Sequence, residues 1–267
     1  MLIDLRDKVA IITGAALGIG RGTALRLADE GVHLVLSDVL EDELEQTWNE
    51  ARAGHPGNRG FTMKVDVASG EQVDGLVSET VKRLGKLDIM VNNAGVGQTV
   101  GAFADTADAV FERIVQVNQR GVFNGIRAAC RVMREQRSGT IINIASWIGK
   151  SGHPFTGVYC STKSAVICMT QVAALEMAQY GVRVNAISPG HVLTAQHWKF
   201  DRDEAQKRGG NVTAEDIQEE KRLSIPQLRM GTPDDMANAV IFLASELASY
   251  VTGHNLDVNG GVDVHSW

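Results

Sequence analysis

The chain has 267 residues, of which 44% are hydrophobic and 22% are charged, and its formal net charge is -6. This is the composition of a globular protein with a sizeable core, and the negative charge gives no electrostatic reason to expect nucleic acid or an anionic membrane as a partner. The charged start of the chain is unlike a secretory signal, and no apolar run is long enough to span a membrane.

Short β-branched runs alternate with helical patterns along the chain. The expected strands cover residues 8–13, 33–37, 61–67, 87–91, 140–145, 183–188 and 254–258. The expected helices cover residues 18–30, a stretch from about 41, 71–84, 107–117, 122–137, 157–180 and 233–244, and Gly181 is a plausible C-terminal cap. This alternation predicts an α/β fold: a Rossmann-type, doubly wound parallel sheet with helices on both faces.

One segment interrupts the alternation. From about residue 191 to residue 230 the chain is long and rich in charged side chains. A stretch of this kind between a strand and the next helix is typical of a substrate-binding lid, and the alternative is a solvated surface insertion.

The three cysteines, Cys130, Cys160 and Cys168, are odd in number and lack the spacing of a zinc site. They predict reduced thiols in a cytoplasmic protein with no metal site. Cys160 adjoins Tyr159 in the sequence, and we interpret it as a small packing residue.

A glycine-rich turn, Thr13–Gly20, follows the first expected strand and opens directly into a helix. Glycines at positions 14, 18 and 20 let the backbone turn tightly and approach a pyrophosphate, while the helix N-terminus offers amide donors and a positive dipole end. The segment therefore predicts a dinucleotide site.

Asp38 ends the second expected strand, eighteen residues after Gly20. A carboxylate there can accept hydrogen bonds from the adenosine ribose of NAD. It would repel the additional phosphate of NADP by about 4 kcal/mol at ~4 Å and an effective dielectric constant of about 20. The sequence therefore predicts NAD as the cofactor.

Tyr159 and Lys163 are four residues apart and share one face of an expected helix. A positive charge beside a phenol lowers the phenol pKa, and bringing it from about 10 to roughly 7 requires about 4 kcal/mol. The pair is a candidate acid/base, although the same spacing also occurs where a solvated lysine lies next to a packed tyrosine.

Four separated motifs follow one another along the chain. They are Thr13–Gly20; Asn92-Asn93-Ala94-Gly95; Ser146 followed by Tyr159 and Lys163; and Pro189-Gly190 followed by Thr194. With them the chain resembles the short-chain dehydrogenase/reductase family over nearly its whole length. The resemblance implies a single NAD-binding catalytic domain, residues 1–267, around about seven strands.

The resemblance also implies roles for particular residues. Tyr159 would transfer the proton, Lys163 would lower the phenol pKa and hold the nicotinamide ribose, Ser146 would bind the substrate oxygen, and Asn118 would hold a relay water. Thr194 would meet the nicotinamide carboxamide. The remaining cofactor positions implied are Gly14, Leu17, Gly18, Ile19, Gly20, Asp38, Asp66, Val67, Asn93, Ala94, Gly95, Pro189, Gly190 and Val192.

Polar and aromatic side chains follow the catalytic motifs. The substrate candidates are Gln98, Trp147, His153, His191, His197 and Trp198, with Lys150 and Gln196 as further pocket positions. Their hydrogen-bonding capacity suits a polyhydroxylated substrate better than a steroid or a long acyl chain. The segments around Tyr159 and His197-Trp198 also resemble bacterial sorbitol (polyol) dehydrogenases of the family.

The expected function is therefore NAD-dependent hydride transfer with a secondary alcohol or ketone, most simply a polyol. A 3-oxoacyl or 3-hydroxyacyl thioester reductase or dehydrogenase is the alternative, and a non-catalytic NAD-sensing protein is a more distant one. The resemblance implies a homotetramer, with a homodimer as the alternative. The C-terminal end, residues 262–267, is expected either to lie against a neighbouring subunit or to fray.

Overall fold

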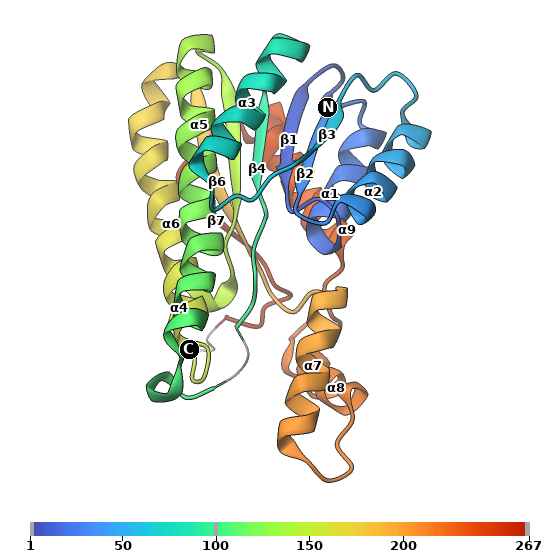
Figure 1. Cartoon of the computed structure of the whole chain (residues 1–267), viewed down its shortest axis with the longest axis vertical. Helices are drawn as coiled ribbons and strands as arrows, with labels where there is room; N and C mark the ends of the chain where they lie inside the picture. Colours follow the sequence, from blue (N-terminus) through green and yellow to red (C-terminus); the bar gives the residue numbers. More distant parts are fainter. Residues whose placement is uncertain (1–2, 99–100, 265–267) are drawn as a thin grey trace.

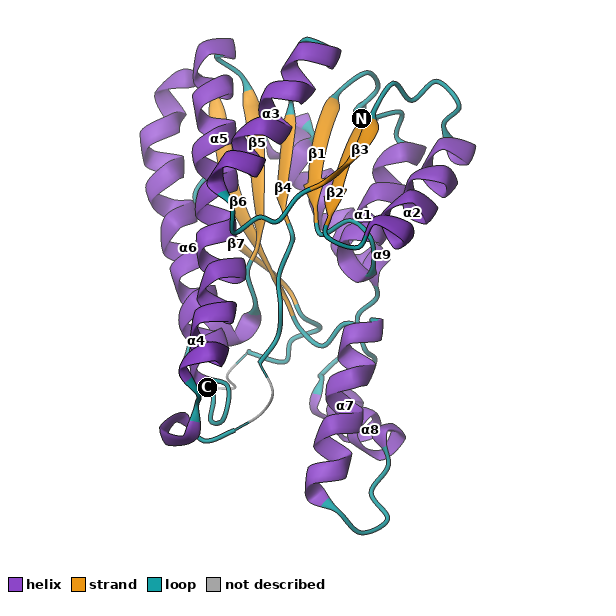
Figure 2. Ribbon diagram, viewed as in Figure 1, coloured by secondary structure: helices purple, strands orange, loops and turns teal. Residues whose placement is uncertain are grey.

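The computed structural model of the chain describes residues 3–98 and 101–264. A central parallel sheet lies between two layers of helices, and a pair of helices projects beyond one end of the sheet (Figures 1 and 2). The doubly wound α/β fold expected from the alternation is confirmed. The very end of the chain, residues 265–267, lies outside the described part.

The sheet has the strand order β3-β2-β1-β4-β5-β6-β7, and every neighbouring pair is parallel. Because β1 pairs with both β2 and β4, the strand order reverses there, and ligands of such sheets bind beyond the carboxyl ends of the strands at this point. The strands are β1 Val9–Thr13, β2 His33–Asp38, β3 Phe61–Lys64, β4 Ile89–Asn92, β5 Gly139–Ile144, β6 Val182–Pro189 and β7 Asn255–Val258.

The helices cover both faces of the sheet because each presents an apolar stripe to it. One buried cluster joins the sheet to α1, α2 and α9, and a second joins its other face to α3, α5 and α6. The α-helices are α1 Gly18–Asp29, α2 Glu41–Gly54, α3 Gly70–Leu84, α4 Asp108–Ile114, α5 Gly121–Gln136, α6 Gly157–Met177, α7 Ala195–Arg208, α8 Ala214–Ser224 and α9 Pro233–Ala244. Short 3-10 turns are η1 Phe103–Asp105, η3 Trp147–Gly149, η4 Ala178–Tyr180 and η5 Glu246–Ala248.

The observed elements differ from the expected ones in the third strand and in the helices around Asn118, and agree at the cap Gly181. The third strand ends at Lys64, three residues earlier than expected. The two helical stretches expected at 107–137 form one continuous run, because the π-helical turn η2 Val115–Arg120 joins α4 to α5. Gly181 has φ +72° at the end of η4 and is the left-handed cap that the sequence indicated.

The charged segment after β6 forms two helices, α7 and α8, which project past the sheet (Figure 1). A parallel bridge between Val192 and Gly231 closes the base of this α7–α8 segment. The Thr194 and Thr213 side chains cap the two helices by accepting hydrogen bonds from backbone N–H groups of the first turns. The sequence indicated a long insertion at this place and missed that it is helical.

Candidate active site

The glycine turn packs against the segment after β4, so small residues are required on both sides. Gly14 has φ +65°, and a Cβ there would lie 2.7 Å from the Ala94 Cα atom. A Cβ on Gly20 would lie 2.1 Å from the Gly14 carbonyl oxygen. The Asn93 amide donates to the carbonyl oxygens of Thr13 and Gly14, both at 2.9 Å. These contacts hold the N-terminus of α1 open toward the carboxyl ends of the strands, as a pyrophosphate site requires.

Asp38 lies at the end of β2, beside this turn. One carboxylate oxygen accepts a hydrogen bond from the Ala16 N–H at 3.0 Å, and the other accepts from the N–H groups of Val39 and Leu40 at 2.7 and 3.2 Å. The carboxylate is therefore fixed in position as an acceptor, and lone pairs remain for ribose hydroxyl groups. Leu17, within the glycine turn, is exposed and uncharged.

The remaining cofactor candidates surround the same end of the sheet. Thr194 lies over the glycine turn, since a Cβ on Gly18 would be 3.3 Å from the Thr194 methyl carbon. Gly190 packs so closely on the segment after β7 that a Cβ would lie 2.9 Å from the Asn259 Cα atom. Val67 is buried and its carbonyl accepts from the Asn124 amide at 2.8 Å, while Asp66 is exposed. Ile19 lies in the first turn of α1, Pro189 ends β6, and Gly95 and Val192 lie in the segments that follow β4 and β6.

Asn118 lies in the π-helical turn, a kind of helix distortion that often marks functional sites. Its buried side chain accepts from the Val96 N–H at 2.7 Å and donates to the Val96 carbonyl at 2.8 Å. A Cβ on Gly95 would lie 3.4 Å from the Asn118 side-chain oxygen and 3.7 Å from Lys163 Nζ. Asn118 and Lys163 therefore flank the same glycine.

Ser146, Tyr159 and Lys163 meet at the carboxyl end of β5. The Lys163 ammonium donates to the Ile144 carbonyl at 2.7 Å and lies 5.6 Å from the centroid of the Tyr159 ring. Ser146 follows β5 by two residues, is nearly buried, and hydrogen-bonds with the Tyr159 side chain. The structure thus brings together the four residues that the sequence placed at the reaction centre.

Burial is the largest influence on the pKa values of Tyr159 and Lys163. Burial raises the pKa of Tyr159 to about 12; the hydrogen bond with Ser146 opposes that rise, and nearby Cys160 adds to it. Burial also lowers the pKa of Lys163 to about 8. Desolvation is therefore the dominant influence on the phenol in the protein alone, and the role of Lys163, together with an oxidised cofactor, in lowering the phenol pKa stays a prediction.

Four nitrogen-bearing rings form a continuous row next to Ser146. The Trp147 ring contacts those of His153 and His191 edge-on, with centroids 4.6 and 5.7 Å away, and His191 contacts His197 at 5.5 Å. Burial lowers the pKa of His191 to about 4 and also lowers that of His197, so both rings are neutral near pH 7. Neutral imidazoles offer one donor and one acceptor each, and the row is suited to binding hydroxyl groups.

A family model described as enoyl-(acyl carrier protein) reductase matches residues 14–263. The 3-oxoacyl-[acyl-carrier-protein] reductase of Staphylococcus epidermidis is 35% identical over 257 residues, which cover 96% of this chain and 99% of that protein. Two solved structures are also similar. The structure of levodione reductase has a TM-score of 0.93 and 33% identity, and the match covers 98% of this chain and 99% of that one. The structure of NAD+-bound xylitol dehydrogenase has a TM-score of 0.90 and 34% identity, and the match covers 96% of this chain and 99% of that one.

The chain belongs to the short-chain dehydrogenase/reductase family. It is therefore an oxidoreductase that acts on CH–OH groups with a nicotinamide cofactor, and the resemblance drawn from four motifs is confirmed. Among residues 3–98 and 101–264, no group of His, Cys, Asp or Glu side chains has the arrangement of a metal site. Within the same residues no helix is both long and apolar enough to cross a membrane.

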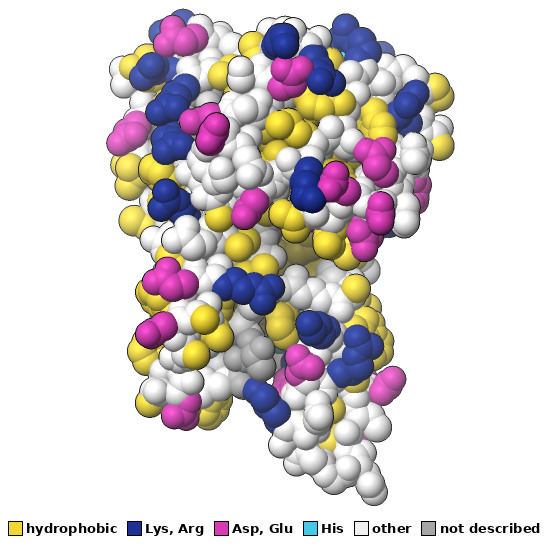
Figure 3. All heavy atoms as spheres, in the orientation of Figure 1, with side chains coloured by type: hydrophobic (Ala, Val, Ile, Leu, Met, Phe, Trp, Pro, Cys, Tyr) yellow, Lys and Arg dark blue, Asp and Glu magenta, His cyan; other side chains and the backbone are white. Residues whose placement is uncertain are grey.

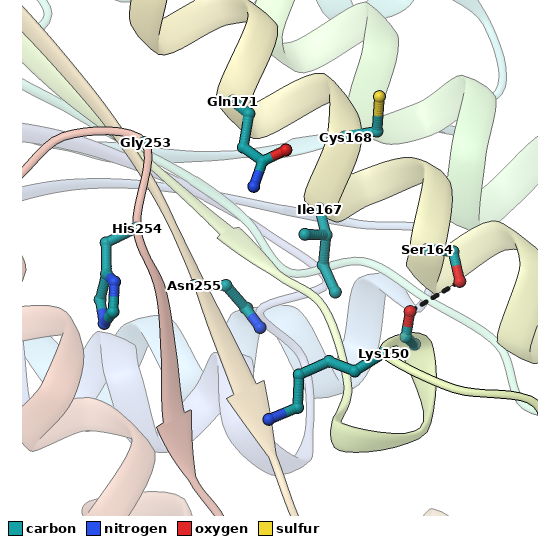
Figure 4. Close-up of a pocket in the computed structure, with 9 residues that line it drawn as sticks. Lys150, Ser164, Ile167, Cys168, Gln171, Gly253, His254 and Asn255 are labelled. Atoms are coloured by element: carbon teal, nitrogen blue, oxygen red, sulfur yellow. Dashed lines mark hydrogen bonds between the residues drawn. The ribbon is translucent and has the colours of Figure 1, made fainter.

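Not every polar residue proposed for the pocket of this dehydrogenase/reductase faces it. Lys150 forms ion pairs with Asp257, at 2.7 Å, and with Asp263. It lines a groove of about 590 Å³ between α6 and β7, whose lining includes none of the four catalytic candidates (Figure 4). Gln98 is buried, and its side-chain oxygen accepts from the Tyr159 N–H at 3.0 Å. Gln98 thus positions the helix that carries Tyr159.

The first turn of α7 carries the last two positions. Gln196 is exposed, and Trp198 is partly buried, with its backbone N–H bonded to the Thr194 carbonyl. Two residues that sequence reasoning missed lie further along the helix. Phe200 packs on the loop after β4, where a Cβ on Gly97 would lie 2.0 Å from its ring, and Asp201 is fully buried. Their only sequence signal is the helical spacing from His197 to Asp201.

Proposed function

We propose that this chain is an NAD-dependent dehydrogenase that transfers hydride between NAD(H) and a secondary alcohol or ketone of a polyol or sugar alcohol. The observation that supports this choice of substrate is the row of nitrogen-bearing rings formed by Trp147, His153, His191 and His197, of which Trp147 directly follows Ser146 in the chain. The choice of NAD is supported by Asp38, a fixed carboxylate where the phosphate of NADP would lie.

In the proposed reaction, Ser146 holds the substrate oxygen and Tyr159, as phenolate, accepts its hydroxyl proton while the carbinol C–H is lost as hydride. Lowering a phenol pKa from about 12 to 7 corresponds to about 7 kcal/mol. When bound, the oxidised nicotinamide supplies the hydride acceptor and a positive charge that favours the phenolate. Lys163 would hold the nicotinamide ribose, and Asn118, which is hydrogen-bonded to Val96, would hold a relay water.

The α7–α8 segment is proposed as the substrate lid of a single catalytic domain. It follows the Pro189-Gly190 strand end, it carries His197, and Phe200 packs against the loop after β4 that also bears Gln98. The molecular surface is notched between the two lower projections, of which one carries α4 and the other carries α7 and α8 (Figure 3). A lid at this place encloses the substrate beside Ser146 and keeps bulk water away from it.

A second candidate function, reduction of a 3-oxoacyl thioester, is favoured by the names of relatives. The family model and the Staphylococcus epidermidis protein are both described as acyl-carrier-protein reductases. Xylitol dehydrogenase, at 34% identity, matches the chain about as well as that protein does at 35%. Identity therefore does not separate the substrates, and the polar ring row favours the polyol.

A panel of substrates tests this proposal. Polyols, simple secondary alcohols and 3-hydroxyacyl or 3-oxoacyl thioesters are supplied with each cofactor, and the absorbance of the reduced cofactor is followed. We expect the highest kcat/KM with a polyol, and NAD preferred over NADP by about a hundredfold or more. Activity confined to thioesters, or equal efficiency with NADP, would contradict the proposal. NAD binding without turnover on any substrate would favour a sensing protein.

We further propose that the protein works in the cytoplasm as a homotetramer, with the homodimer as the alternative. The family membership supports this assembly, and so do exposed apolar side chains on the neighbouring helices α5 and α6. Phe123 on α5 and Val172 and Leu175 on α6 are 47%, 49% and 82% exposed in the single chain. Side chains of this kind on neighbouring helices are typical of surfaces that a second subunit covers.

A further inference from the structure

A charged network is buried between the two helices of the α7–α8 segment. Asp201, on α7, has no solvent-exposed surface. One of its carboxylate oxygens accepts a hydrogen bond from Lys221 Nζ, on α8, at 2.6 Å, and Lys221 also contacts Glu204 at 3.2 Å. Burying a carboxylate is costly unless its oxygens are satisfied, so the second oxygen of Asp201 needs a partner.

That second oxygen faces a ring nitrogen that is also unsatisfied. Asp201 Oδ2 lies 3.7 Å from His197 Nε2, one helical turn earlier, and both atoms are buried with no hydrogen-bond partner among the described residues. Buried polar atoms without partners are uncommon, and two that face each other require an explanation. A shift of less than 1 Å would bring them within hydrogen-bond distance.

The pair is connected to the reaction centre by the ring row. His197 contacts His191, His191 contacts Trp147, and Trp147 follows Ser146 directly in the chain. The distances along this path are 5.5 and 5.7 Å between ring centroids. His197 on α7 is therefore linked through packed rings to Trp147, the residue after Ser146.

We propose that Asp201 is a positioning residue that fixes the proton of His197 on Nε2, so that Nδ1 is presented as an acceptor to a substrate hydroxyl group remote from the reacting carbon. In a neutral imidazole one nitrogen donates and the other accepts, so holding one proton determines the role of both. Lys221 donates to the other carboxylate oxygen of Asp201 and joins α7 to α8. The inference rests on the proposed polyol substrate and names the group that recognises it.

The first test does not depend on the substrate. Histidine labelled with 15N reports by NMR which ring nitrogen carries the proton, and His197→Gln identifies the signal of His197. We expect Nε2–H in the wild type and a mixture of tautomers in Asp201→Asn. The control is Asp203→Asn, the same change two residues along α7, which should leave the tautomer unchanged. The same signal in Asp201→Asn as in the wild type would overturn the proposal.

The second test separates recognition from folding. Asp201→Asn is expected to raise KM for a polyol about tenfold, with kcat, the Kd for NAD and KM for a simple secondary alcohol within about twofold. An equal rise in KM for the polyol and for the simple secondary alcohol would show that Asp201 has a structural role and would overturn the proposal. If Asp201→Asn does not fold, Asp201→Asn/Lys221→Met removes both charges of the pair and should give the same NMR and KM results.

The tests also distinguish this inference from the proposed function. If the wild type oxidises no polyol, the proposed function fails, while the NMR experiment still decides whether Asp201 sets the tautomer of His197. If polyols are oxidised and Asp201→Asn changes neither KM nor the tautomer, only the present inference fails.

Discussion

Two buried groups with opposite pKa shifts form the centre of the site. Burial raises the pKa of Tyr159 to about 12 and lowers that of Lys163 to about 8. Desolvation disfavours the charged form of each group, so the lysine alone does not produce a phenolate at neutral pH. We therefore propose that burial destabilises the charged form of Lys163. The positive charge that favours the Tyr159 phenolate would be supplied by the oxidised cofactor.

The cost of the buried Lys163 charge can be measured by pH-dependent unfolding without cofactor. Between pH 8 and 10.5 Lys163 holds its proton in the unfolded chain but not in the folded chain, so the contribution of this residue to stability should rise with pH in this window. Lys163→Met should be more stable than the wild type below pH 8, by on the order of 2–3 kcal/mol, and this difference should shrink toward pH 10.5. The exposed control Lys82→Met should show no such trend. A pH-independent difference for Lys163→Met would contradict the buried-charge account.

At the scale of elements, the site is built where three separate segments converge on the carboxyl ends of β1, β4 and β5. The glycine turn after β1 is bound by Asn93 after β4, and Gly95 lies between Asn118 and Lys163. The α7–α8 segment meets this group through Phe200, which packs on Gly97. The contact explains how a helix projecting beyond the sheet is docked on the loop that carries Gln98.

Gly97→Ala tests this docking. The new Cβ would lie 2.0 Å from the Phe200 ring, so the ring and α7 must shift, whereas the fold of the sheet is unaffected. We expect KM for the substrate to rise severalfold with little change in Tm, and Gly97→Ala/Phe200→Leu to recover part of the loss. Gly75→Ala, where a Cβ meets nothing within 4 Å, is the control. An unchanged KM in Gly97→Ala would show that α7 does not close on the substrate.

Much of this arrangement can be predicted from the sequence, because its signals are local. Strand ends, glycines and the Tyr159–Lys163 spacing follow from periodicity and steric requirements. The helices α7 and α8 could not be predicted in the same way, since they bury few apolar residues and are held by capping threonines and the Asp201–Lys221 pair. The π-helical turn at Asn118 was not predicted either, because the sequence indicated a break between two helices at residues 118–121, where the structure continues the helix with a wider turn.

At the scale of the whole molecule, activity is expected to depend on subunit assembly as well as on the catalytic residues. The outer faces of α5 and α6 expose apolar side chains that a single chain leaves uncovered. The catalytic pair Tyr159 and Lys163 lies on α6, so pairing of this helix with a second copy would stabilise the element that carries them. Assembly and activity are therefore expected to be lost together.

Leu175→Glu tests the assembly. Light scattering of the wild type should give four times the chain mass of 28.8 kDa, and the new charge should disfavour burial of α6 and lower the measured mass. Val212→Glu, at an exposed apolar position between α7 and α8, is the control and should keep the wild-type mass. A wild-type monomer, or a tetramer that survives Leu175→Glu unchanged, would show that this surface is not the interface.

The most direct measurement of the central claim is the steady-state and binding behaviour of Tyr159→Phe. Removing one hydroxyl group leaves the ring in place and deletes the proposed base. We predict that kcat of this variant is lower by about a thousandfold or more, while its Kd for NAD stays within about twofold of the wild type. A Tyr159→Phe enzyme with kcat within tenfold of the wild type would contradict the account.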